Sequence, residues 1–178
     1  MRIVGDLGTI ELVNEPMYTF GSTDNTRSYP FARNLASRDR ASSVHGLLLN
    51  GEPIAVFGSG GGASGVHAHS ATYVNSLLYV AVGDSVVCVE LSPFELKWSV
   101  KVDEATCFGI YFQAEHKALI SHGELEIARI SETGRVLWSA SGADIFSERF
   151  SLLPQFIEAV DFNGRTYRFK YENGESDV

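Results

Sequence analysis

The chain has 178 residues, of which 44% are hydrophobic and 20% are charged. This composition is typical of a folded globular domain, and the length suffices for one domain (1–178) with a buried core. The net charge of −8 argues against nucleic-acid binding and against charge-driven docking on anionic membranes, since both need a basic surface. No apolar run approaches the roughly 18 residues of a membrane helix. We therefore expect neither a nucleic-acid nor a membrane partner.

The N-terminal segment, residues 1–16, contains acidic residues and no long apolar stretch, which disfavours a secretory signal. Cys88 and Cys107 each lie in an apolar, strand-like run. Without an export signal, these two cysteines are expected to be reduced and buried. The sequence therefore predicts a cytoplasmic protein.

The first third of the chain predicts a degenerate β-unit over about 7–66. Residues 7–20 suggest a strand pair or an edge, and residues 41–60 suggest a hairpin that turns at Asn50-Gly51. Helical signals are confined to 30–39 and 142–153, where a short turn or two of helix is expected.

The next segment, GSGGGASGVHAHS (58–70), resembles a phosphate-binding loop and formally satisfies G-x-G-x-x-G from Gly60 to Gly65. A dinucleotide site needs a helix that begins at the last glycine. The residues after that glycine, VHAHSATYV, are strand-like instead, and the lysine of a P-loop is missing. The segment therefore predicts a flexible loop, and no organic cofactor is expected.

Residues 77–175 contain a repeat of about forty residues. Gly83 and Gly123 are 40 positions apart, as are Trp98 and Trp138, and Gly164 opens a third copy that ends before a tryptophan strand. The repeat predicts units at about 72–102, 103–142 and 150–175.

Four short strands per forty residues are typical of a propeller blade, whose two faces are covered only when blades stack. The sequence therefore predicts an all-β fold: a small β-propeller-like array of about four blade units of antiparallel strands, closed or partial. Trp98 and Trp138 are expected to pack between neighbouring blades.

The stretch IARISETGRVLWSAS (127–141) resembles the repeat of quinoprotein-type, or pyrroloquinoline-quinone-like, β-propellers, in which an acidic turn and Thr-Gly precede a tryptophan. The matching residues are Glu132, Thr133, Gly134 and Trp138. Residues 88–100 match more loosely, since Pro93-Phe94 replaces the Thr-Gly. Segments such as GVHAHSATYV and AVDFNGRTYRF are also similar to an uncharacterised bacterial protein family. These resemblances imply a scaffold, but no quinone site and no activity.

His67 and His69 are the strongest candidates for a metal site. Alternate residues of a strand face the same side, so both imidazoles could reach one ion. The acidic second ligand of the similar H-x-H motif of cupins is missing. A hydrogen-bonded structural pair is therefore the competing interpretation, and a divalent metal is the only cofactor considered.

The remaining polar candidates form a possible ligand rim, at His45, Asp84, His122 and Glu124. His122 is expected to be exposed or bonded to a nearby backbone group. The sequence favours a non-enzymatic module that binds a protein or a small molecule, and that forms homo-oligomers if edge strands pair. The alternative is a metal-dependent hydrolase or lyase that uses His67 and His69.

Overall fold

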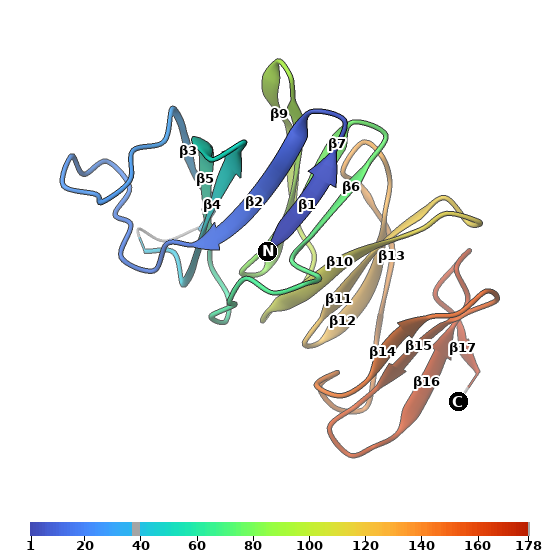
Figure 1. The fold of residues 1–178 in the computed structure, drawn as a ribbon. Helices are drawn as coiled ribbons and strands as arrows, with labels where there is room; N and C mark the ends of the chain where they lie inside the picture. The colour runs from blue at the N-terminus through green and yellow to red at the C-terminus, as the bar shows by residue number, and fades with distance from the viewer. Residues whose placement is uncertain (37–39, 178) are drawn as a thin grey trace.

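Residues 1–36 and 40–177, the part of the chain that the computed structural model describes, form four β-sheets and no helix (Figure 1). The all-β prediction is therefore confirmed. The helical turns predicted at 30–39 and 142–153 are wrong for the described residues: strand β3 begins at Phe31, and the second segment is a loop that leads into β14. Residues 37–39 lie outside the described part. No described element is a helix that could cross a membrane.

The first sheet has five strands in the order β1-β2-β4-β5-β3. They are β1 (Arg2–Gly5), β2 (Gly8–Asn14), β3 (Phe31–Asn34), β4 (Ser43–Leu49) and β5 (Glu52–Ser59). The β4–β5 hairpin turns at Asn50-Gly51, where both residues have positive φ angles, as a two-residue hairpin loop requires. The sequence predicts only antiparallel strands, but β3 pairs in parallel with β5. The long β2–β4 connection allows this, because it returns the chain to the far edge of the sheet.

Each of the other three sheets is an antiparallel meander of four strands that are consecutive in the chain. The second sheet comprises β6 (Ala71–Val74), β7 (Leu77–Val82), β8 (Ser85–Leu91) and β9 (Phe94–Lys101). The third comprises β10 (Cys107–Gln113), β11 (Ala118–Gly123), β12 (Glu126–Ile130) and β13 (Val136–Ser141). The fourth comprises β14 (Phe150–Leu152), β15 (Ile157–Val160), β16 (Thr166–Phe169) and β17 (Ser176–Asp177).

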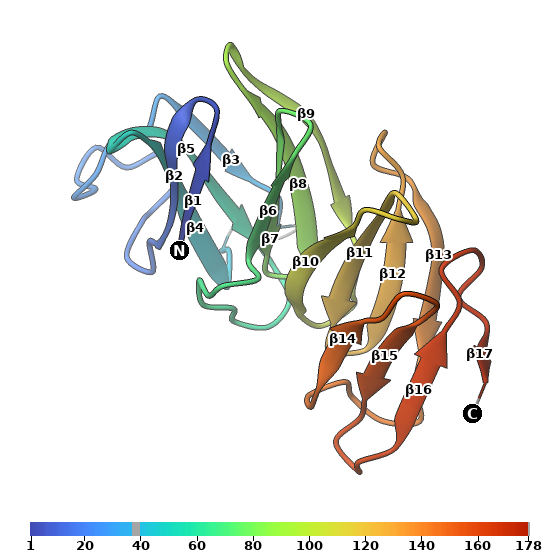
Figure 2. The same ribbon diagram turned by 45° about the vertical axis from the view of Figure 1, so that its right-hand side comes forward.

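The sheets stack face to face and bury a separate apolar layer at each junction. β7 and β8 are buried along almost their whole length, because neighbouring sheets cover both of their faces. Cys88 and Cys107 are buried free thiols in the layer between the second and third sheets. The stack runs from the first sheet at the N-terminus to the fourth at the C-terminus, and these two sheets lie at opposite ends and do not close a ring (Figure 2).

The two tryptophans pack across successive junctions, as predicted. The half-buried indole of Trp98 (β9) lies against Gly134, in the β12–β13 turn of the next sheet, and donates to Glu132 O at 2.8 Å. The indole of Trp138 (β13) lies in the same way against Gly174 and donates to Tyr171 O at 2.9 Å. Each ring thus connects one sheet to a glycine turn of the following sheet.

The two outer faces of the stack are covered differently. On the first sheet, Tyr18, Phe20 and Tyr29 of the β2–β3 connection pack over Val44 and Val56. On the fourth sheet, the polar face carries a nearly buried carboxylate, Glu158, which accepts hydrogen bonds from Arg149 at 2.9 Å and from Arg168 at 3.3 Å.

Candidate functional site

Backbone hydrogen bonds join all four sheets at one end of the stack, where the turns of successive sheets meet. Asp84 N donates to Gly60 O at 3.1 Å between the first and second sheets, and Cys107 N donates to Gly83 O at 2.7 Å between the second and third. In the β13–β14 connection, Phe146 N donates to Glu124 O of the third sheet at 2.7 Å, and Ile145 O accepts from Phe162 N of the fourth sheet at 2.8 Å. We call them the inter-sheet bonds. They fix the relative positions of the sheets, because each sheet end donates to or accepts from its neighbour.

The glycine-rich loop takes part in this contact. Gly62 N donates to Ala105 O at 2.9 Å, and Gly61 has a φ of +77°. A Cβ on Gly61 would overlap Ala105 O, and one on Gly83 would overlap Gly60 O. The sequence predicts a flexible loop, whereas the structure shows a loop bonded to the connection between β9 and β10. Close backbone approach explains why Gly61 and Gly83 are glycines.

Two acidic residues of the predicted rim lie at this same end. Asp84 accepts hydrogen bonds from the hydroxyls of Ser59 at 2.6 Å and Ser85 at 2.8 Å, so its carboxylate links the first two sheets. Glu124 lies close to Gly62. The sequence did not single out Asp103, which is buried and accepts three backbone N–H bonds around the turns next to Glu124.

His67 uses both ring nitrogens for hydrogen bonds. The backbone N–H of His69 donates to Nδ1 at 3.2 Å, so Nε2 carries the proton and donates to Phe108 O at 2.6 Å. The rings of His67 and His69 have centroids 6.2 Å apart. A metal ion on either nitrogen of His67 would displace one of these bonds. Among the described residues, no three His, Cys, Asp or Glu side chains form a group suited to a metal ion.

The other two histidines of the predicted rim are buried. The ring nitrogens of His45 face Ala81 O at 3.2 Å and Ser64 O at 3.3 Å, and burial lowers its pKa. His122, expected to be exposed or bonded to backbone, is buried and bonds to Phe146 O at 3.1 Å. Burial, with smaller contributions from the nearby His67 and His69, lowers the pKa of His122 to about 4. The structure thus gathers four of the five histidines.

Four rings stack in a continuous row beside these histidines. His69 stacks on Tyr111 at 4.8 Å, Tyr111 contacts Phe150 at 4.8 Å, and Phe150 stacks on His122 at 4.4 Å between centroids. We call His69, Tyr111, Phe150 and His122 the aromatic row. Burial raises the pKa of Tyr111 to about 12, so its phenol is protonated at neutral pH.

Three members of the aromatic row, His69, Tyr111 and Phe150, line a groove of about 390 Å³ between the first strands of three sheets, β6, β10 and β14. Its lining residues are Ala68, His69, Ala71, Thr72, Ile110, Tyr111, Phe112, Phe150, Ser151 and Leu152. The sequence prediction includes His69 but misses Tyr111 and Phe150. One signal could have found them: each is an aromatic residue on the first strand of its repeat.

Neither a protein-family model nor a curated protein sequence matches this chain.

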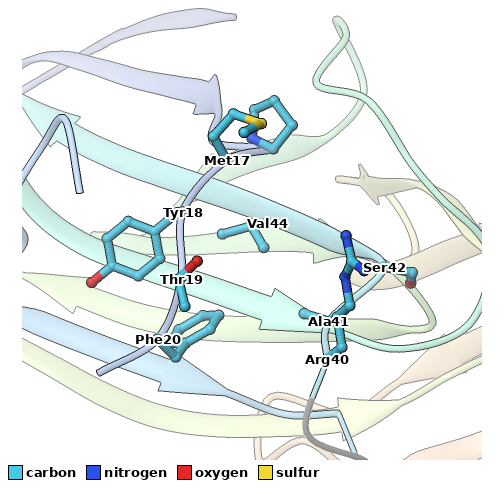
Figure 3. Close-up of a pocket in the computed structure, with 9 residues that line it drawn as sticks. Met17, Tyr18, Thr19, Phe20, Arg40, Ala41, Ser42 and Val44 are labelled. Atoms are coloured by element: carbon cyan, nitrogen blue, oxygen red, sulfur yellow. The ribbon is translucent and has the colours of Figure 1, made fainter. Parts of the chain in front are cut away.

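A second cavity, of about 470 Å³, lies over the outer face of the first sheet (Figure 3). Met17, Tyr18 and Phe20 line one side, Arg40 lies on the other, and Val44 forms the floor. This cavity lies on the opposite face of β4 from His45, so it is separate from the histidines and from the aromatic row.

Because His122 is buried, the free energy of unfolding depends on pH. Its folded-state pKa of about 4 lies below the unfolded value of 6.5, so the stabilisation is complete above pH 6.5 and is lost as the pH falls toward 4. Lowering the pH from 7 to 4 should therefore reduce the free energy of unfolding by about 2–3 kcal/mol through this residue. Urea unfolding of His122→Gln should show a correspondingly weaker pH dependence, whereas the His116→Gln control should keep the wild-type dependence. Identical pH profiles for His122→Gln and wild type would contradict this assignment.

Proposed function

We propose that this protein is a non-enzymatic binding module on a propeller-like scaffold, and that its ligand lies in the groove between β6, β10 and β14. The observation that carries the proposal is the convergence of the first strands of three separate sheets on one groove lined by His69, Tyr111 and Phe150. Ligand sites are typically concave, mostly apolar and supplied with a few polar groups. The groove is concave and combines apolar and aromatic side chains with polar groups.

The sheets around the groove are suited to holding a preformed binding site. The inter-sheet bonds fix the second, third and fourth sheets relative to one another, so Tyr111 and Phe150 are held on strands of connected sheets. His69 lies in the turn before β6, where its C=O accepts from Ile110 N at 2.9 Å. A preformed site loses less entropy when it binds than one that must become ordered first. The rigidity of the stack therefore supports binding at this place.

The scaffold proposal extends the resemblance to quinoprotein-type repeats. The indole of Trp98 lies on the Thr133-Gly134 turn of the next sheet, which supports treating each four-stranded sheet as a blade of an open array. The buried free thiols of Cys88 and Cys107 support a reducing, cytoplasmic location.

The alternative is a metal-dependent hydrolase or lyase with His67 and His69 as ligands. The 6.2 Å between their rings favours it, and the engagement of both ring nitrogens of His67 disfavours it. Metal analysis of protein purified without a chelator or a metal-binding tag separates the two. Stoichiometric metal that disappears in His67→Ala/His69→Ala would support the enzyme and overturn the proposed function.

The groove can be tested directly with ¹⁵N-labelled protein and a library of aromatic fragments that contain indole, phenol or imidazole rings. We expect the fragments to shift amide signals of residues 68–72, 110–112 and 150–152. Tyr111→Leu removes the centre of the aromatic row and should weaken the best fragment at least about tenfold. Phe162→Leu, at an exposed site (64%), is the matched control and should leave affinity unchanged. Fragments that bind only beside Met17 and Arg40, or nowhere, would contradict the proposal.

A further inference from the structure

The register of the third sheet shows which backbone groups of β10 face the groove. Ile110 pairs with Ser121, and Phe112 pairs with Leu119. Ile110 N donates away from β11, to His69 O at 2.9 Å. Since bonded and non-bonded pairs alternate in an antiparallel ladder, the N–H and C=O of Phe112 also point away from β11. The edge of β10 that faces the groove therefore offers the C=O of Ile110 and both groups of Phe112.

The first strands of the fourth and second sheets, β14 and β6, also have backbone groups that point away from the neighbouring strand. In β14, Val160 N bonds to Arg149 O and Leu153 N to Phe156 O, so the backbone groups of the intervening Phe150 and Leu152 point away from β15. In β6, Ala81 N bonds to Ser70 O, so the backbone of Ala71 points away from β7. Three sheet edges thus direct backbone donors and acceptors to one groove.

The start of the β10 edge already binds a turn of the chain itself, residues 67–70. His69 O accepts from Ile110 N, and the His67 side chain donates to Phe108 O at 2.6 Å. The free edge, from the C=O of Ile110 to Phe112, continues this interface directly into the groove. Tyr111 and Phe150 form the apolar wall beside it.

We propose that the groove binds an extended peptide segment of a partner protein, which pairs with β10 as an added strand at Ile110–Phe112. This inference rests on the proposed function and names the ligand class of the same site. A regular row of backbone donors and acceptors is complementary to the backbone of an extended peptide, and the aromatic row provides a surface for its side chains. A compact small molecule would use the aromatic wall and leave the strand edge unpaired.

Position 112 offers a substitution that removes one backbone donor at the free edge. Phe112→Pro deletes the N–H that points into the groove, and proline is tolerated on an edge strand where its nitrogen faces away from the ladder. Phe112→Ala is the matched control, since it also loses the ring but keeps the N–H. The two variants are compared first by thermal unfolding and by their amide spectra, to show that both fold.

The probe is a phage-displayed library of random seven-residue peptides, selected on the wild-type protein, with the best peptide then synthesised. We expect this peptide to shift amides of residues 108–114 and to bind Phe112→Pro at least about tenfold more weakly than Phe112→Ala, since the two variants differ in the backbone N–H and both lack the ring. Equal affinity for the two variants would overturn the inference.

A second measurement does not depend on the fold of the proline variant. N-methylation of single peptide amides should abolish binding at alternate positions only, because one edge of the added strand pairs with β10. Loss at consecutive positions, or at none, would overturn strand pairing. If aromatic fragments bind in the groove but no selected peptide shifts the amide signals of β10, the inference fails and the proposed function stands. If neither probe binds the groove, both fail.

Discussion

Trp138→Ala should lower the free energy of unfolding by about 3–5 kcal/mol. The indole lies against Gly174 and packs with the apolar layer between the third and fourth sheets. Its N–H donates to Tyr171 O, which the substitution leaves with one partner fewer. The loss therefore combines buried apolar area, a cavity at the junction and one hydrogen bond.

Two further variants isolate the causes in urea unfolding. Trp138→Phe keeps a ring but removes the N–H donor, so an intermediate loss of about 1–2 kcal/mol is expected. Leu137→Ala changes the neighbouring residue on the opposite, exposed face (45%) and should change stability by less than about 1 kcal/mol. A loss below about 1 kcal/mol for Trp138→Ala would show that the ring does not hold the junction.

Gly134→Ala should cost about 2–4 kcal/mol, although it adds a single methyl group. The residue has a φ of +79°, and a Cβ would lie 2.6 Å from Cδ2 of Trp98. Gly164→Ala is the matched control, because Gly164 has a φ of +81° and no atom within 4 Å of the added Cβ. This control carries only the backbone strain, about 1 kcal/mol.

A double-mutant cycle assigns the difference to the indole. In the Trp98→Ala background the overlap is removed, so Gly134→Ala should then cost no more than Gly164→Ala does. Both substitutions are measured by urea unfolding against the same parent. Additive losses would mean that the ring does not lie on the glycine turn.

The sequence predicted the features of the fold that repeat locally. The glycine turns and β-branched runs of residues 77–175 marked strands, and the spacing of Trp98 and Trp138 marked the sheet junctions, because hairpins depend on neighbouring residues. The first sheet was harder to predict. Its edge strand β3 pairs in parallel with β5 across the long β2–β4 connection, and no local pattern specifies such a pairing.

The candidate site was predicted only in part, because its residues meet through stacking of separate sheets. The H-x-H pattern identified His67 and His69, yet its metal interpretation did not foresee that a carbonyl and a backbone N–H engage His67. Tyr111 and Phe150 are 39 residues apart and carry no motif. They join His69 only because successive repeats place their first strands side by side.

The stacking of four sheets through their turns is most directly tested by hydrogen exchange of single amides. If the sheets form one connected stack, the amides of Asp84, Cys107 and Phe146 are each bonded to a neighbouring sheet. They should exchange at least about a hundredfold more slowly than the amide of Gly51 in the exposed β4–β5 turn. Exchange of all three as fast as Gly51 would contradict the connected stack and the groove that depends on it.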